Sequence, residues 1–334
     1  MPWPNAAAFA ADLATDTAPP AAEIRLSTTL GPAYPQGKAG EVWARLIRER
    51  SNGRLVVRHY PGATLFQRDA TREFAALRDG SISFAVGSAL AWSPHLVELN
   101  VFALPWLVRD AAALDQLVAS PVASVLAARL APIGVVVVAW SANGFREIAS
   151  RRAVQSPGDL AGMRVRAPGL DLLDGTLAAL GANPVQMNAG EARRAALGDR
   201  LDAEETTVGA FRASRAAAAG FSYLQLWGAH ADALLFAINR RVWEALPADD
   251  QALVRQSAQD AAAEASALRE RVSGAAALGD AGRLGAIVTR LTPAGKEGFR
   301  NATRGVYDRW AAIIGGDLVG EAEAAVSAGA AAPR

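Results

Sequence analysis

The chain has 334 residues, of which 34 are basic, 33 are acidic and none is cysteine, so its formal net charge is +1. The missing cysteine excludes disulfides, thiolate catalysis and cysteine-ligated metals, and the balanced charge argues against a dedicated nucleic-acid surface. No apolar run reaches the roughly 18–20 residues that span a bilayer. A chain of this length has room for two lobes of roughly 120–180 residues each.

The first 22 residues are small, proline-containing and aperiodic, and we expect them to be disordered. They lack the basic start and the continuous apolar core of a secretory signal. Two explanations stay open: a trimmed or engineered start, or a native start that was assigned wrongly.

A regular alternation of strands and helices begins at residue 23. The pattern predicts strands over residues 23–30, 54–62 and 82–90, separated by helices over 38–53 and 71–83. The first helix places Val42, Leu46 and Ile47 on one face. Such a strand–helix–strand–helix–strand run implies a mainly parallel sheet with helices on its faces.

The alternation continues in the second part of the chain. We expect helices between residues 111 and 130, a buried strand over 134–140, short strands over 161–169 and 182–187 around a helix over 170–181, a helix over 190–200, and a strand ending near 207. Residues 233–247 are expected to form a strand followed by the first turn of a helix. A long amphipathic helix over 249–282 comes next. The alanine-rich stretch over 321–334 is expected to be loose.

This order predicts an α/β protein with two lobes, each a mixed, mostly parallel sheet flanked by helices, with the long helix bridging the lobes. We expect lobe I to comprise residues 23–144 plus about 233–275, and lobe II to comprise residues 145–232 plus about 276–320. Two lobes joined by several crossovers have a hinge and a cleft, and a cleft of this kind is where open α/β sheets bind ligands.

Two arginines are the best candidates for a ligand contact. The strand over 161–169 presents Arg164 and Arg166 on the same side. A planar guanidinium donates two parallel hydrogen bonds to a carboxylate, so an arginine that faces a cleft suits an organic acid. Arg146 follows a buried strand within the segment 143–147. From the residues alone, ordinary surface ion pairs explain Arg146 and Arg166 equally well.

Seven short motifs, in the right order and spacing, carry a family resemblance from Ile24 to about Gly316. They are Asn52-Gly53-Arg54-Leu55 before Tyr60-Pro61-Gly62, Ala103-Leu104-Pro105-Trp106, Gly144-Phe145-Arg146, the run from Asp159 through Arg166, Leu180-Gly181-Ala182-Asn183-Pro184-Val185, and Ile238-Asn239 with Trp243 and Leu246-Pro247. On these motifs the chain resembles the periplasmic solute-binding component of tripartite ATP-independent periplasmic (TRAP) transporters, which includes C4-dicarboxylate binders.

The resemblance implies a two-lobed periplasmic-binding-protein fold and a periplasmic location, with a signal peptide in the precursor. It implies a monomer without a cofactor that delivers a small organic anion to the small and large membrane subunits of a transporter. It also implies that Arg166 makes the main salt bridge to the ligand's carboxylate and that Arg146 makes a second contact. Arg164 is expected to be solvated.

The chain departs from the family pattern where the ligand is expected. Thr206 stands in place of an asparagine that commonly touches ligand, Glu204 replaces a neutral glutamine, and Ala189 replaces an aromatic residue. Because Glu204 disfavours a second anionic group, we expect a bulkier monocarboxylate such as a sugar acid, a hydroxy or keto acid, or an aromatic acid. A C4-dicarboxylate binder, and a sensor or scavenger that is not coupled to transport, stay as alternatives.

Three aromatic residues are further candidates for the cleft. Trp92 follows the strand over 82–90, whose carboxyl end is expected to face the cleft. Phe211 is a candidate for the same wall, although core packing explains it at least as well. Tyr34 lies in a turn-rich loop, where contact with ligand and contact with solvent are equally expected.

A catalytic function finds no support in the sequence. There is no Gly-x-Ser-x-Gly elbow, no glycine-rich phosphate loop and no His/Glu pair at metal-binding spacing. Glu204 and Glu205 are adjacent, so on a strand their side chains point to opposite faces and cannot share acid–base work. We therefore expect a binding protein and not an enzyme.

Overall fold

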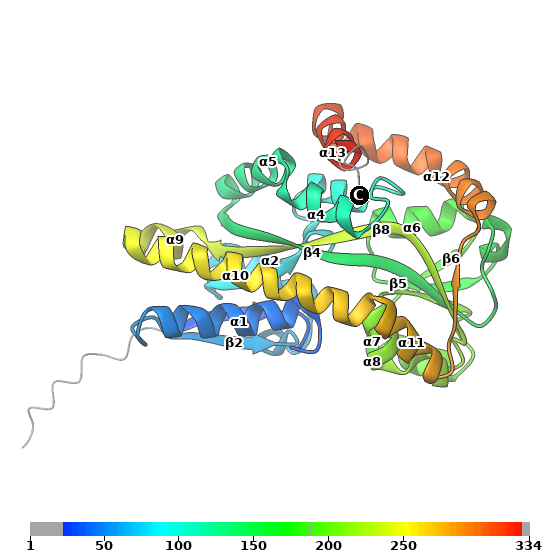
Figure 1. The fold of residues 1–334 in the computed structure, drawn as a ribbon, viewed down its shortest axis with the longest axis horizontal. Coiled ribbons are helices and arrows are strands. Elements are labelled where there is room, and N and C mark those ends of the chain that lie inside the picture. Colours follow the sequence, from blue (N-terminus) through cyan, green and yellow to red (C-terminus); the bar gives the residue numbers. More distant parts are fainter. Residues whose placement is uncertain (1–22, 188, 329–334) are drawn as a thin grey trace, which may run out of the picture.

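Two long antiparallel strands, β4 (Val135–Ser150) and β8 (Tyr223–Asn239), run side by side through the middle of the molecule (Figure 1). They belong to a computed structural model that describes residues 23–187 and 189–328, so the disorder expected over residues 1–22 falls outside the described residues. Both strands are buried along most of their length. Each half of the molecule is built around one end of this pair.

Up to residue 283 most of the remaining elements follow the predicted alternation, and no strand or helix was predicted beyond it. The other strands are β1 (Ile24–Thr28), β2 (Val57–Pro61), β3 (Phe84–Ser88), β5 (Arg164–Ala167), β6 (Asn183–Gln186), β7 (Ala203–Thr206) and β9 (Ile287–Arg290). The α-helices are α1 (Pro35–Arg50), α2 (Glu73–Asp79), α3 (Ala89–Trp92), α4 (Ala111–Ala119), α5 (Pro121–Leu130), α6 (Asp171–Ala179), α7 (Ala189–Leu197), α8 (Val208–Ser214), α9 (Arg240–Ala245), α10 (Ala248–Ser273), α11 (Ala275–Arg283), α12 (Pro293–Ile314) and α13 (Gly316–Ala328). Short 3-10 turns cover Thr64–Phe66, Ala70–Arg72, Val97–Ala103, Ala131–Ile133, Pro157–Leu160 and Ala216–Ala219.

All the strands belong to one mixed sheet in the order β2-β1-β3-β8-β4-β7-β5-β6, with β9 also paired to β8. On one side β2, β1 and β3 are parallel, and β3 pairs antiparallel with the second half of β8. On the other side β7, β5 and β6 are parallel, and β7 pairs antiparallel with the end of β4. The predicted fold class, a two-lobed α/β protein with mixed, mostly parallel strands flanked by helices, is confirmed, but the strands of both halves join in one sheet.

The pairing of β4 with β8 is interrupted near the middle of both strands. Its register shifts between Ala142 and Gly144, where Gly144 lies opposite Asp232, and again between Arg146 and Ile148. Such bulges bend a strand and re-aim its side chains. The predicted lobe boundaries at residues 144/145 and 232/233 fall at the first bulge, and they stay a prediction.

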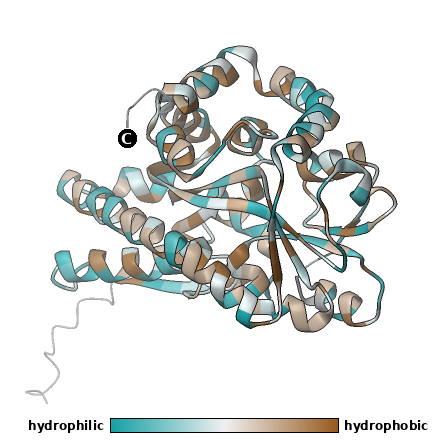
Figure 2. Ribbon diagram, turned by 45° about the vertical axis from the view of Figure 1, so that its right-hand side comes forward, coloured by the Kyte–Doolittle hydropathy of each residue, from teal (hydrophilic) through white to brown (hydrophobic). Residues whose placement is uncertain are grey.

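Hydrophobic side chains fill both faces of the sheet in each half. Between the sheet and helices α1 and α10, Trp43 packs on Phe84 and Phe236 with ring centroids 5.0 and 5.4 Å apart. The opposite face of this first half is covered by helices α2 to α5 together with α13. The second half has its own clusters around Val165 and Phe221. In Figure 2 the helices are banded in both colours, as amphipathic helices that cover a core should be.

The predicted long helix is two helices in the structure. Helix α10 ends at Ser273, Gly274 takes an extended backbone, and α11 begins at Ala275. A Cβ on Gly274 would lie 2.5 Å from the Glu270 carbonyl oxygen, so a glycine is needed at this break between the two helices. Helix α10 runs from α1 in the first half to α8 and α11 in the second and so bridges them (Figure 1).

The C-terminal helices differ from the expectation for residues 276–334. Helix α12 places Phe299 in the core of the second half, but Val306 and Trp310 in that of the first. Helix α13 continues to Ala328, and its buried Ala322 and Val326 face α4, where a loose tail was expected from residue 321. Small side chains let two helices approach closely, which compensates for the little area that each alanine buries. Residues 329–334 lie outside the described part of the chain.

Within residues 23–187 and 189–328, no helix by itself combines the length and hydropathy needed to cross a membrane. The only segments that do so jointly are Ala111–Ala119 and Pro121–Ile133, which are bent by 55° relative to each other.

Candidate ligand-binding site

A cavity of about 350 Å³ lies beside the bulge of β4, where the two halves of the molecule meet. The loop after β1 and the end of α10 close it on one side, and the carboxyl ends of β5 and β7 with the start of α8 close it on the other. Its lining consists of Leu30, Tyr34, Pro35, Asn143, Gly144, Phe145, Arg146, Arg166, Pro168, Ala196, Glu204, Thr206, Thr207, Val208, Gly209, Ala210, Ser214, Ala216, Ala219, Phe221, Val272 and Ser273. Mostly apolar walls with a few polar groups are typical of a small-molecule site.

Arg166 on β5 is the polar residue of this cavity best suited to an anion. Its Nε donates to the Met187 carbonyl at 3.0 Å and its Nη1 to the Glu205 carbonyl at 3.3 Å. These two bonds fix the guanidinium plane but neutralise no charge, and no described carboxylate forms an ion pair with it within 4.0 Å. Burial lowers the pKa of Arg166, since desolvation penalises its charged form. The remaining donors are therefore available to a ligand carboxylate.

Arg146 on β4 lines the same cavity but already has a carboxylate partner. Its Nε donates to Glu205 Oε1, and its Nη2 donates to Oε2 at 2.5 Å. The Glu205 side chain is 1 % exposed, so the pair is largely removed from water. Burial disfavours the charge on Arg146, but Glu205, together with Asp232 and Glu147, outweighs it, and the pKa of Arg146 is raised. Arg146 therefore brings little free positive charge to the cavity.

Glu204 and Thr206 reach the cavity from β7, two residues apart on one strand. Glu204 is the cross-strand neighbour of Arg166 in the parallel pairing of β5 with β7. Burial raises the pKa of Glu204, and the charge of Arg166 opposes that rise. Thr206 is buried, and its hydroxyl has only a long 3.5 Å contact to the Thr207 carbonyl. The adjacent Glu205 pairs with Arg146, on the neighbouring strand β4.

Two further polar side chains lie in the wall nearest the first half. Tyr34 is half-buried at the start of α1, and burial raises the pKa of its phenol. Asn143 donates through Nδ2 to Asp232 at 2.7 Å, and Asp232 also accepts from Ser88 and from the Leu90 backbone. Asn143 is thus held in place by a buried network.

Of the eight residues predicted for the site, five line this cavity: Arg166, Arg146, Thr206, Glu204 and Tyr34. Ala189 begins α7, but its side chain lies outside the described part of the structure.

Trp92 and Phe211 are placed elsewhere, in the two cores. Trp92 is 2 % exposed and folds back onto Gly87, because the glycine leaves the space that the indole fills, and it stacks edge-on against Phe74 at 5.2 Å. Phe211 is buried with Phe221 and Leu201 in the core of the second half. In α8 the first turn, Val208 to Ala210, and the last residue, Ser214, line the cavity.

Several lining residues have no signal that sequence reasoning used. Asn143 and Phe145 precede the predicted Arg146 within the segment 143–147, so that motif could have suggested them. Three others are brought together only by the fold. Leu30 lies in a loop, Phe221 lies just before β8, and Val272 lies at the end of α10. Among the described residues, no cluster of three His, Asp or Glu side chains could hold a metal ion.

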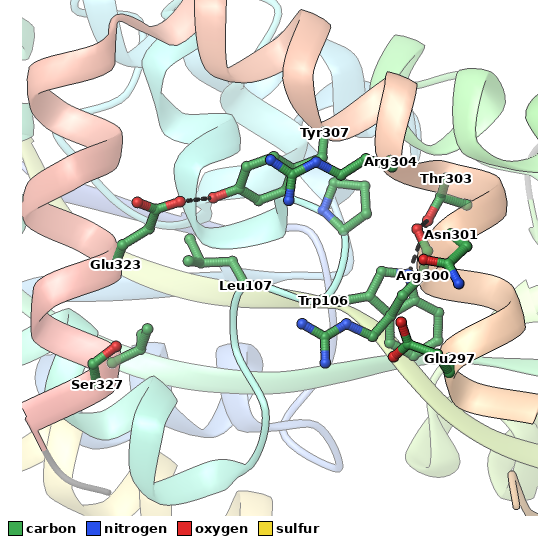
Figure 3. A pocket seen from close by; sticks show the side chains of 12 residues that line it. Trp106, Leu107, Glu297, Arg300, Asn301, Thr303, Arg304, Tyr307, Glu323 and Ser327 are labelled. Atoms are coloured by element: carbon green, nitrogen blue, oxygen red, sulfur yellow. Dashed lines mark hydrogen bonds between the residues drawn. The ribbon is translucent and has the colours of Figure 1, made fainter. Parts of the chain in front are cut away.

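A second cavity, of about 470 Å³, lies between the turn at Pro105 to Leu107 and helices α12 and α13 (Figure 3). Two pairs of its polar side chains bond to each other: Trp106 Nε1 donates to Thr303 at 3.0 Å, and the Tyr307 hydroxyl donates to Glu323 at 2.5 Å. None of the residues predicted for the site lines it. Its chemistry gives no reason to prefer it to the cavity at Arg166.

Comparison with known proteins identifies the family. Residues 26–312 match the bacterial extracellular solute-binding proteins of family 7. A TRAP periplasmic solute-binding protein from Ralstonia eutropha H16, solved with bound (S)-2-acetolactate, is 43% identical and has a TM-score of 0.87, with 91% of this chain and 98% of that chain covered.

Two curated relatives are more distant. The C4-dicarboxylate-binding periplasmic protein DctP of Vibrio cholerae is 24% identical over 88% of this chain and 87% of its own length. The uncharacterized protein y4mM of Sinorhizobium fredii is 29% identical over 85% of this chain, which spans about half (52%) of that protein's length. The match over residues 26–312 and the 43% identical relative agree with the motifs around Arg166: this chain belongs to the TRAP periplasmic solute-binding proteins, within bacterial extracellular solute-binding protein family 7.

Proposed function

We propose that this protein captures a small organic monocarboxylate in the cavity at Arg166 and delivers it, in the periplasm and as a monomer, to the membrane subunits of a TRAP transporter. The observation that carries the proposal is the guanidinium of Arg166. It is held in a largely apolar cavity by two backbone carbonyls and has no carboxylate partner among the described residues. A ligand carboxylate supplies the missing charge through charge-assisted hydrogen bonds.

The charge distribution of the cavity favours one ligand carboxylate over two. Arg146 and Glu205 neutralise each other, which leaves Arg166 as the positive group and Glu204 as a negative one. A second carboxylate on the ligand would lack a cation and would lie near Glu204, and like charges in a desolvated site repel. Under this proposal Thr206 and Tyr34 are further polar contacts.

The relative that binds (S)-2-acetolactate supports a short hydroxy or keto acid as the ligand. That compound is (S)-2-hydroxy-2-methyl-3-oxobutanoate, a branched monocarboxylate. The cavity here has apolar walls at Leu30, Phe145 and Val208 that suit a branched carbon skeleton. The C4-dicarboxylate relatives share less sequence with this chain.

A thermal-shift screen against organic acids, followed by calorimetry, tests the proposal. A ligand at 100 times its Kd adds about 2.7 kcal/mol to stability and is readily detected. We expect a hydroxy or keto monocarboxylate to bind tightest, and to be recovered chemically unchanged, since we propose no catalysis. Succinate or malate as the tightest ligand would contradict the proposed ligand class.

The transport role has a separate test. Membrane subunits encoded beside this gene, reconstituted in vesicles, should take up the ligand only when this protein is added. A protein that binds the acid but supports no uptake is a sensor or scavenger with the same fold.

A further inference from the structure

The Glu204 carboxyl group has no hydrogen-bond partner among the described side chains. It is half-buried on β7, lines the cavity beside Arg166, and no hydrogen bond or ion pair within 4.0 Å joins it to any described side chain. A carboxyl group removed from water costs free energy unless it is hydrogen-bonded. Something other than the protein should therefore bond to Glu204 when the cavity excludes water.

The neighbouring polar groups are already committed to other partners. Arg146 is held by Glu205, and Asn143 by Asp232. Arg166 donates to two backbone carbonyls and keeps its other donors for the ligand carboxylate. Glu204 is thus the acidic group that faces the part of the ligand next to its carboxylate, because Glu204 and Arg166 are direct cross-strand neighbours.

We propose that Glu204 selects hydroxy acids by binding a hydroxyl group of the ligand, next to the carboxylate held by Arg166. This proposal rests on the proposed function and narrows its ligand class. A second carboxylate repels an ionised glutamate, and a ketone oxygen can only accept, so it needs the protonated form. A hydroxyl donates to a carboxylate and accepts from a carboxylic acid, so it alone suits Glu204 in either protonation state.

Matched ligands isolate this hydroxyl. The pair 2-hydroxy-2-methylbutanoate and 2,2-dimethylbutanoate differs by a hydroxyl in place of a methyl group of similar size, with the same charge and carbon branching. Because a hydrogen bond to a charged group is stronger than a neutral one, we expect calorimetry to show at least about tenfold tighter binding of the hydroxy acid. Equal affinities would overturn the proposal.

Variants assign the preference to Glu204. In Glu204→Met the preference should fall to about onefold while 2,2-dimethylbutanoate still binds, which also shows that the variant site is folded. Glu49→Met is the matched control, since it makes the same substitution at an exposed glutamate of α1 that pairs with Arg45 at 2.8 Å outside the cavity. It should keep the preference. A preference that persists in Glu204→Met, or that disappears in Glu49→Met, contradicts the assignment.

Failure of the proposed function looks different. If neither acid binds the unaltered protein, or if Arg166→Ala binds both as well as the unaltered protein does, the carboxylate site itself is elsewhere. If both bind equally and both depend on Arg166, the site stands and only the role of Glu204 is lost.

Discussion

Arg146 and Glu205 are joined by two side-chain hydrogen bonds between neighbouring strands, β4 and β7, with the carboxylate 1 % exposed. Taking both charges out of water is costly, and the pair recovers that cost only while both partners are present. This relationship sets the charge available in the cavity, because it removes Arg146 as a free cation. It also distinguishes the two arginines of the cavity, since Arg146 has a carboxylate partner and Arg166 has none among the described residues.

Removing Glu205 alone should destabilise the protein more than removing the pair. Glu205→Leu leaves a buried arginine without a partner, and we expect a loss of about 3–5 kcal/mol in the free energy of unfolding. The double variant Arg146→Met/Glu205→Leu should lose less than Glu205→Leu alone, and urea denaturation of both single variants and the double variant measures the coupling in a double-mutant cycle. Additive losses would show that the pair does not interact as a unit.

Arg166→Ala should abolish most carboxylate binding. The ligand charge then loses its partner in a desolvated site, and we expect calorimetry to show a loss of about 2–5 kcal/mol. Arg164→Ala is the matched control, since Arg164 lies two residues earlier on the same strand, is exposed, and pairs with Asp202 at 2.9 Å outside the cavity. It should bind as the unaltered protein does; equal effects of the two variants would argue against an anchoring role for Arg166.

Glu73→Gln should change how stability depends on pH. Burial raises the pKa of Glu73 to about 8 from its ordinary 4.5, although Ser27 donates to it at 2.8 Å. The folded state thus holds this proton where the unfolded state has lost it. The contribution of Glu73 to stability is fully present below about pH 4.5 and is lost as the pH rises through about 8.

The neutral amide of Glu73→Gln mimics the protonated carboxyl and cannot ionise. Its melting temperature should exceed that of the unaltered protein most at pH 8, and the difference should shrink towards pH 5. A constant difference across this range would mean that Glu73 is already ionised in the folded protein.

Gly37→Ala should weaken ligand binding from a distance. A Cβ at Gly37, on α1, would lie 2.1 Å from the carbonyl carbon of Gly31, so the loop that carries Leu30 and Tyr34 into the cavity must move. We expect lower affinity by calorimetry and a lower melting temperature. Gly305→Ala, on α12 with nothing within 4 Å of the added Cβ, should instead stabilise by roughly 0.5–1 kcal/mol and leave affinity unchanged.

The sequence was sufficient to predict much of the sheet and the strand that carries Arg166, because both follow from local pattern. Strand alternation places Arg166 at the end of β5, and the motif around it identifies the family. The partner of Arg146 could not be predicted in this way: Glu205 is 59 residues away, and no local pattern reports which side chain lies across a strand.

The differences at Trp92 and at the C-terminus have equally specific causes. Position after a strand suggested that Trp92 faces the cleft, but the space left by Gly87 lets the indole fold inward. Alanine content suggested a loose tail, yet Ala322 of α13 is fully buried against the first half. In both places the outcome depends on which side chain lies opposite, and composition does not contain that information.

The unbroken course of β4 and β8 has a mechanical consequence. The two strands pair with each other on both sides of the bulge at Gly144. The halves are therefore connected by one hydrogen-bonded ladder and not by flexible linkers. Any movement that narrows the cavity must therefore bend this ladder, and the elastic work of bending is subtracted from the contact free energy of every ligand. A sheet bent in this way is strained, so it relaxes to its resting shape when the ligand leaves.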